Sequence, residues 1–208
     1  MTIASIGFIF SLAILVVSVM VHEIAHGWVA FILGDPTAKL AGRLTLNPIK
    51  HIDPVGSIIV PFVLYLLTAS SGGIIFGWAK PVPYNPYNLK VKNGPAYVAL
   101  AGPASNFIIA IIFSLLIRSG LGVSLLGLQV LPILSTIVLI NIMLGLFNLI
   151  PIPPLDGSTI LFSFFPPRSK FIEIFSRYQF VIILAIIFGA GFIINGLLTL
   201  IFHFLTGL

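Results

Sequence analysis

Three residues near the N-terminus have the types and the spacing of a catalytic zinc site. His22 and His26 are four residues apart, and Glu23 directly follows the first histidine. On a helix these histidines lie on one face, one turn apart, so two imidazole nitrogens can reach one Zn²⁺ at about 2.0–2.1 Å. Glu23 is then placed to act as general base on a metal-bound water. The segment predicts a hydrolytic zinc centre.

The alternative is a polar helix end that faces a cavity and matches the motif by chance. The chain has only four histidines and five acidic residues, and three of these lie within five positions of an apolar run. Ionisable groups inside a membrane span are costly, and a metal that uses the histidine lone pairs offsets part of that cost. This concentration favours the metal interpretation.

The composition indicates that lipid surrounds the elements that carry these residues. The chain has 208 residues, of which 59% are hydrophobic and 7% charged, with a mean hydropathy of +1.19. A soluble domain has about 25% charged residues. The net charge of +5 does not indicate nucleic-acid binding, because the basic residues are scattered between apolar segments. Without cysteine, disulfides and Cys-ligated metal sites are excluded.

Four segments are long enough to cross a hydrocarbon core, which needs roughly 20 apolar residues. They are residues 4–33, about 95–117, about 130–150 and about 178–206. A shorter run, 55–69, suits a re-entrant or short membrane segment. The sequence predicts an all-α polytopic membrane protein with about four transmembrane helices, forming a single domain over 1–208. The first span has no signal-peptide features, so we expect it to be retained.

Basic residues predict the topology. The linkers 34–53, 70–94 and 151–177 hold nine lysines and arginines, whereas the linker 118–129 holds only Arg118. If 55–69 does not cross the membrane, the three basic linkers share one side, which is then cytoplasmic. Both termini then lie outside. If 55–69 crosses, most of this bias disappears.

Asp156 is the best candidate for a third zinc ligand. Catalytic zinc usually has three protein ligands and an open position for water. Asp156 follows prolines at the end of the third span, at the cytoplasmic edge where His22 and His26 are also expected. The alternative is an N-cap of a following helix. His51 and Asp53 are weaker candidates.

Two asparagines inside predicted spans offer polar groups for substrate. Asn106, in the sequence GPASN, could bind substrate backbone or a developing oxyanion. Alternatively, it forms an interhelical hydrogen bond, beside small residues that allow close packing. Asn148, one turn before Pro151, has the same two interpretations.

The segment 72–88 is too rich in proline and glycine for a regular helix. It could pair with an extended substrate or cover the water route to zinc. Alternatively, it is an interfacial loop anchored by Trp78, Tyr84 and Tyr87.

The motifs VHEIAHGWVA, AGPASN and NLIPIPPLDG together resemble the site-2 protease family of intramembrane zinc metalloproteases. GWAKPVPYNP resembles a segment of one bacterial and archaeal branch. The resemblance covers about residues 20–160 and implies one Zn²⁺ per chain, held by His22, His26 and Asp156, with Glu23 as catalytic base. Unlike larger members, this chain has no room for a PDZ or CBS domain.

The function expected from this resemblance is a zinc endopeptidase that cleaves transmembrane segments of membrane-protein substrates. We expect a multi-pass protein of a prokaryotic cell membrane with its active site toward the cytoplasm. Its partners would be the substrate and the lipid bilayer, without nucleic acid, and the oligomeric state stays open. The alternatives are a metal transporter or sensor, or an inactive protease homologue.

Overall fold

The chain folds around three long apolar helices. The computed structural model describes residues 3–68, 77–166, 169–179, 181–182 and 191–208. The long helices are α1 (Ile3–Ile32), α4 (Gly94–Arg118) and α6 (Leu131–Asn148). Each is long and apolar enough to cross a membrane. The first three predicted spans are therefore confirmed.

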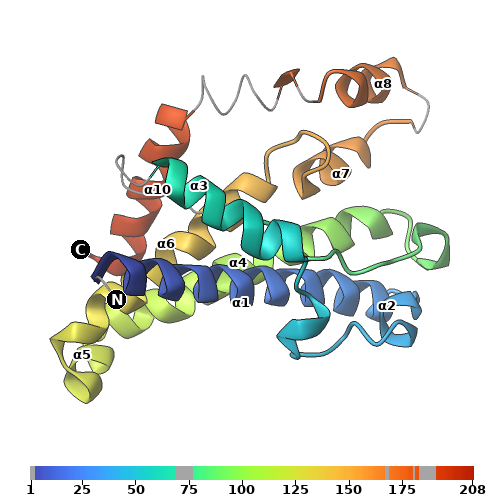
Figure 1. The fold of residues 1–208 in the computed structure, drawn as a ribbon. Coiled ribbons are helices and arrows are strands. Elements are labelled where there is room, and N and C mark those ends of the chain that lie inside the picture. Colours follow the sequence, from blue (N-terminus) through green and yellow to red (C-terminus); the bar gives the residue numbers. More distant parts are fainter. Residues whose placement is uncertain (1–2, 69–76, 167–168, 180, 183–190) are drawn as a thin grey trace.

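The fourth predicted span, 178–206, lies partly outside the described residues, which omit 180 and 183–190. Its last part is α10 (Gly191–Thr206), which packs against α4 and α6 (Figure 1). The shorter elements are α2 (Thr37–Leu40), η1 (Pro48–Lys50), η2 (Pro54–Ile59), α3 (Val60–Thr68), η4 (Pro86–Asn88), α5 (Leu121–Leu126), η5 (Leu128–Val130), α7 (Asp156–Phe162) and α8 (Lys170–Arg177).

No β-strand occurs among the described residues. Since the backbone polar groups of a helix are satisfied within the helix, apolar helices can face lipid. The chain is an all-α polytopic membrane protein, as its sequence predicts.

The helices pack around α4, which contacts both α1 and α6. A buried apolar cluster joins α4 to α6 near one end of the bundle, and α10 closes over it. Its buried members are Ala110, Ile117, Val130, Leu134, Val138 and Ile142. Polar side chains are buried at other levels between the same helices, and they form the candidate site described below.

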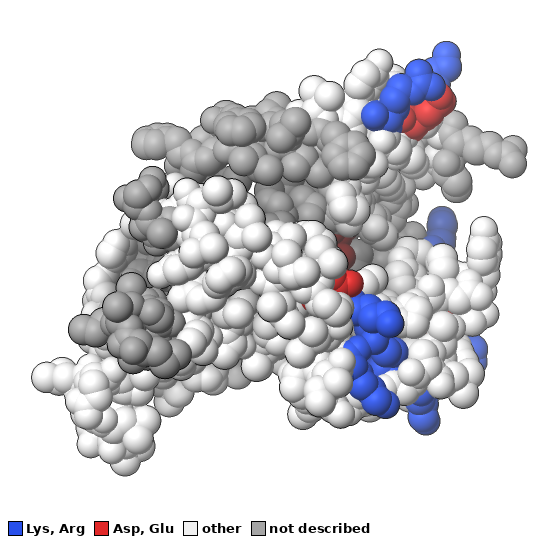
Figure 2. Space-filling view, viewed as in Figure 1, with Lys and Arg blue, Asp and Glu red and all other residues white. Residues whose placement is uncertain are grey.

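The two ends of the bundle differ in charge. In Figure 1 both termini and α5 lie at one end, whereas α2 and α8 lie at the other. Arg118 Nη1, at the end of α4, donates a hydrogen bond to Phe204 O of α10, which ties the C-terminus to the first end. On the face shown in Figure 2, the Lys and Arg side chains gather at the end with α2 and α8. This separation corresponds to the predicted grouping of the basic linkers.

The segment Pro54–Thr68 runs alongside α1 toward the N-terminus of that helix. Its start packs beside Val19 of α1, and its Tyr65 ring lies 4.2 Å from the Phe8 ring, close to the N-terminus. Trp78 N then donates to Gly56 O at 3.0 Å. Gly56 and Trp78 thus lie beside each other, at the same level of α1, and Pro54–Thr68 is an apolar helical segment too short to be one of the three long spans. Residues 69–76 lie outside the described part.

Candidate metal centre and active site

Three side-chain atoms from α1 and α7 converge on one point. His22 Nε2 and His26 Nε2 are 3.0 Å apart. Asp156 Oδ2 lies 3.1 Å from the first and 3.3 Å from the second. Among the described residues, this is the one group of three or more His, Cys, Asp or Glu side chains that could hold a metal ion. The structure therefore brings Asp156 to His22 and His26, which precede it by more than one hundred residues in the sequence.

Both histidines direct an unprotonated ring nitrogen, Nε2, toward this point. His26 Nδ1 lies 2.6 Å from Val98 O, a carbonyl that can only accept, so Nδ1 carries the proton. His22 Nδ1 lies 2.7 Å from Asn106 Oδ1. With both Nδ1 atoms donating, both Nε2 atoms keep a lone pair for a metal. Ring orientation by such hydrogen bonds is usual for metal-binding histidines.

The orientation of the Asn106 amide is itself set by a buried network. Asn106 Nδ2 donates to Asn141 Oδ1 of α6 at 3.0 Å. Asn141 Nδ2 in turn donates to Ser18 Oγ and to Ile137 O, each at 2.9 Å. Since Ile137 O can only accept, Asn141 must direct its oxygen to Asn106, and Asn106 must direct its own oxygen to His22. The network thereby fixes the protonation of His22.

Gly102 leaves the space that the two histidines occupy. A Cβ atom at this position would lie far inside van der Waals distance of both His22 Nε2 and His26 Nε2. The sequence indicates only close helix packing at this glycine, within α4. The structure shows that the neighbour is the face of α1 that carries His22 and His26.

Asp156 occupies the first turn of α7 and not its N-cap. The N-cap is Leu155, which makes no side-chain capping bond. The Asp156 Oδ2 atom is buried and has no hydrogen-bond donor. Gly157 permits this placement, because a Cβ there would collide with Leu149 O at the end of α6. The capping alternative for Asp156 is thus not the observed arrangement.

The donor set fits a zinc ion. A tetrahedral Zn²⁺ with ligands at about 2.0–2.2 Å keeps ligand atoms roughly 3.3–3.5 Å apart, close to the spacings of the three atoms here. Two histidine lone pairs and a carboxylate oxygen without a donor repel one another unless a cation or protons lie between them. Two imidazoles and one carboxylate are also a common ligand set of catalytic zinc.

Glu23 lies beside this group of side chains, in a cavity that they line together. An extended segment, residues 77–85, which we call the strap, contacts Glu23. Val82 N of the strap donates to Glu23 Oε2 at 2.7 Å. One oxygen of the Glu23 carboxylate therefore accepts a hydrogen bond from the strap backbone. Further along, the strap is fixed at Asn85, whose N–H donates to Asp35 Oδ2 at 2.7 Å.

Two cavities meet at the candidate site. One, of about 300 Å³, is lined by twelve residues: His22, Glu23, His26, Pro81, Val82, Tyr84, Val98, Ala99, Asn148, Pro154, Asp156 and Thr159. The second, of about 270 Å³, shares His22, Glu23, Asn148 and Pro154 with the first and continues along strap residues Gly77, Trp78 and Ala79. Together they form a path past Glu23, between the strap and the segment that leads into α7.

The two predicted asparagines have different surroundings. Asn106 is fully buried, and its amide hydrogen bonds go to His22, Asn141 and Ser18. It does not line either cavity, so the geometry corresponds to the interhelical alternative. Asn148 lines both cavities. Its Nδ2 donates to Leu144 O at 3.0 Å, which leaves the second N–H and the oxygen of the amide for other partners.

His51 and Asp53 lie outside the metal-binding group. His51 is buried, with Nε2 2.9 Å from Thr45 O. Asp53 caps the turn that begins at Pro54, because its Oδ1 accepts from Val55 N and Gly56 N. Both have structural partners.

The three aromatic residues expected as interfacial anchors also have different surroundings. Tyr87 is almost completely exposed, and Trp78 is partly exposed, as such anchors would be. Tyr84 instead lines the cavity with the metal-binding residues. Burial and the negative charge of Asp156 raise the pKa of the Tyr84 hydroxyl, so it is a neutral hydrogen-bond donor at pH 7. Nothing in the sequence distinguished Tyr84 from the other two aromatic residues as a residue that lines the site cavity.

Comparisons with known proteins identify the family of this chain. Residues 123–186 match the family model "Peptidase family M50". The chain is 41% identical over 182 residues to a protein of Bacillus subtilis (strain 168) named "Putative zinc metalloprotease YwhC", covering 83% of this chain and 77% of that protein. No solved structure matches the chain significantly.

More distant relatives are longer than the matched region. A protein of Mycolicibacterium smegmatis named "Putative zinc metalloprotease Rip2" is 32% identical to this chain. The match covers 72% of this chain and 55% of that protein. "Zinc metalloprotease MJ0392" of Methanocaldococcus jannaschii is 29% identical over 71% of this chain and 32% of its own length. The match to the Bacillus protein covers most of both chains. The chain therefore belongs to peptidase family M50, the site-2 protease family of zinc metalloproteases.

Proposed function

We propose that this zinc metalloprotease cleaves transmembrane segments of other membrane proteins. The observation that carries the proposal is the position of His22, Glu23 and His26 within α1, a helix long enough to span the membrane. Asp156 and the strap lie against the same stretch of α1. The reacting groups thus stand where a membrane-embedded peptide bond could reach them.

His22, His26 and Asp156 would hold one Zn²⁺ in this centre. When bound, the ion supplies Lewis acidity and lowers the pKa of a bound water toward about 7. Glu23 accepts the proton of the attacking water on the oxygen that Val82 leaves free, and it later transfers a proton to the leaving amine. The Val82 N–H keeps the carboxylate in place during both transfers.

Substrate backbone would occupy the path past Glu23. A helical substrate must unwind there, because its own hydrogen bonds otherwise cover the scissile peptide. Asn148 lines both parts of the path, so its second amide N–H is suitable for binding the substrate carbonyl or the developing oxyanion. Asn106 would act only through His22.

The test of this function compares wild type with Glu23→Gln on a panel of purified membrane-protein substrates. We expect no cleavage by the variant but an unchanged zinc content near one per chain, because Glu23 acts on water and is not a ligand. Loss of zinc together with activity would show that Glu23 is a ligand. Cleavage only of soluble peptides by the wild type would contradict the proposed substrate class.

The orientation is part of the proposal, with the end that carries α2 and α8 in the cytoplasm. The chain has no cysteine, so single cysteines can be introduced without background. Lys92→Cys and Arg177→Cys should be labelled only from the cytoplasmic side, and Leu125→Cys only from outside. Labelling of Lys92→Cys from outside would reverse the proposed orientation.

A further inference from the structure

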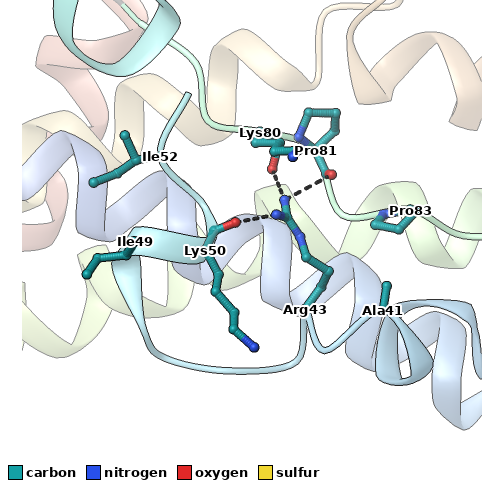
Figure 3. A pocket seen from close by; sticks show the side chains of 8 residues that line it. All are labelled: Ala41, Arg43, Ile49, Lys50, Ile52, Lys80, Pro81 and Pro83. Atoms are coloured by element: carbon teal, nitrogen blue, oxygen red, sulfur yellow. Dashed lines mark hydrogen bonds between the residues drawn. The ribbon is translucent and has the colours of Figure 1, made fainter. Parts of the chain in front are cut away.

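The strap is fixed from its other side by a buried arginine. Arg43 donates hydrogen bonds to Lys80 O at 2.7 Å and Pro81 O at 3.2 Å on the strap, and to Lys50 O (Figure 3). All three acceptors are backbone carbonyls. Arg43 therefore joins the segment at η1 to the strap, two residues before Val82 meets Glu23.

The charge of Arg43 is not neutralised by a carboxylate. Its side chain is about nine-tenths buried, and its Nε atom is buried without a partner. Within the described ranges, no acidic side chain forms an ion pair with it. A largely buried cation with neutral partners creates a positive potential that favours an anion nearby.

The surface beside Arg43 is a cavity of about 590 Å³ that collects further positive charge. Arg43, Lys50 and Lys80 line it together with Ala41, Ile49, Ile52, Pro81 and Pro83. Of the described residues, no Asp or Glu lines it. Three of the eight lining residues are cationic and the other five are apolar, a combination that matches a molecule with an anionic head and an apolar body.

Exposed aliphatic residues near the cavity in sequence have the character of a membrane-contacting surface, and one of them, Ile49, lines the cavity. Leu40, Leu46 and Ile49 are each about three-quarters exposed or more, although they neighbour Arg43 and Lys50 in sequence. Exposed aliphatic side chains among basic ones are typical of segments that lie in the interface of an anionic membrane. A free phosphate ion or an acidic peptide would make no use of these residues.

The depth of the cavity suits the same ligand. α1 has 30 residues, about 45 Å at 1.5 Å per residue, against a hydrocarbon core about 30 Å thick. The helix is thus about 15 Å longer than the core is thick, and a helix of this length tilts or projects beyond the core. Glu23, which the strap contacts, lies nine residues before the end of α1 at Ile32. The cavity lies on the far side of the strap, and its Arg43 and Lys50 follow α2, at the end of the bundle where Lys and Arg gather (Figure 2). Basic residues of this kind flank membrane spans at headgroup level.

We propose that this cavity binds an anionic phospholipid, with the phosphate at Arg43, Lys50 and Lys80 and an acyl chain along Ile49 and Ile52. The site is separate from the zinc centre, but Pro81 lines both cavities. Bound lipid would therefore hold the strap against Arg43 and keep Val82 on Glu23.

The experiment measures binding of a fluorescent short-chain phosphatidylglycerol to the zinc-loaded protein in neutral detergent. Lys50→Gln/Lys80→Gln should weaken binding about thirtyfold, because each basic residue near a membrane surface changes anionic-lipid affinity about fivefold. Lys92→Gln/Lys170→Gln is the matched control, since it removes the same charge outside the cavity. The control should bind like wild type, and all three proteins should keep their zinc.

Two competition arms identify the source of the anion. Inorganic phosphate and a phosphatidylcholine of equal chain length should displace the probe only at concentrations at least about tenfold above that of unlabelled phosphatidylglycerol. Equal competition by inorganic phosphate, or stronger competition by an acidic peptide, would overturn the lipid assignment. Equal weakening in both double variants would reduce the effect to general surface charge and would also overturn it. None of these results depends on proteolysis, so the zinc-protease proposal is tested separately.

Discussion

Asn106 Oδ1 lies 2.7 Å from His22 Nδ1, and this one contact connects the metal centre in α1 to a polar network that reaches α6. The network members Ser18, Asn106 and Asn141 are all buried. Leaving one of their polar groups unpaired there is costly, so the network has essentially one satisfied arrangement. That arrangement directs the Nε2 lone pair of His22 toward His26 and Asp156 in the absence of a metal.

Replacing Asn141 should weaken zinc binding although Asn141 does not touch the metal site. Asn141→Leu removes the acceptor for Asn106 Nδ2, so the Asn106 amide can rotate and offer its nitrogen to His22. We expect zinc affinity to fall about 10–100-fold, the range for partners of metal ligands. Competition with a chelator measures it. Asn148→Leu, which lies on the same helix outside the network, is the control, and equal affinities in both variants would exclude this role.

Gly102→Ala should abolish high-affinity zinc binding, because the added methyl group would occupy the space of the two Nε2 atoms. Gly196→Ala on α10 is a matched control, since its Cβ meets no neighbour within 4 Å. The control should be neutral or slightly stabilising, as for Gly→Ala in a helix. Normal zinc content in Gly102→Ala would show that α1 and α4 are not this close in the functional protein.

Asp156→Ala and Asp156→Asn separate a ligand from a helix cap. If Asp156 binds the metal, both variants should lose zinc affinity by more than about 100-fold, beyond the effect of losing a partner of a ligand. The neutral amide of Asn is a poor donor, so it should not rescue binding. Because Asp and Asn are nearly equal as N-caps, an Asp156→Asn protein with normal zinc and cleavage would support the capping alternative.

Asp35 should make the folded protein sensitive to acid. Burial alone would raise the pKa of its carboxyl, but hydrogen bonds from Thr37, Asn88 and the Asn85 backbone outweigh burial and lower the pKa below 3.8. A lowered pKa in the folded state gives stability that is present above the unfolded pKa and is lost as pH falls through the folded value.

Thermal unfolding of wild type and Asp35→Asn tests this from pH 7 to pH 3. The variant should be less stable at pH 7 by about 1–3 kcal/mol, because an amide nitrogen would face donors that a carboxylate accepts. The difference should shrink below about pH 4. A constant difference across this range would show that the Asp35 charge does not contribute. Glu173→Gln, an exposed carboxylate on α8, controls for charge removal.

The sequence by itself indicated that lipid surrounds the chain, which segments span the membrane, and that the chain carries the motif of a zinc hydrolase. Apolar length identified α1, α4 and α6 because a membrane span needs roughly 20 apolar residues whatever the fold. The spacing of His22 and His26 indicated one metal-binding face because helix geometry is local. Motif resemblance pointed to Asp156, and position along the chain pointed the same way.

Tertiary structure alone decided which groups support these residues. Gly102 and Asn141 are distant from His22 in sequence, so no spacing rule connects them to it. The contact of Val82 with Glu23, and the separate cavity around Arg43, depend on where the extended strap crosses α1. Extended segments with prolines have no period that would fix their path. Their position follows from long-range hydrogen bonds, which form only once the helices have packed.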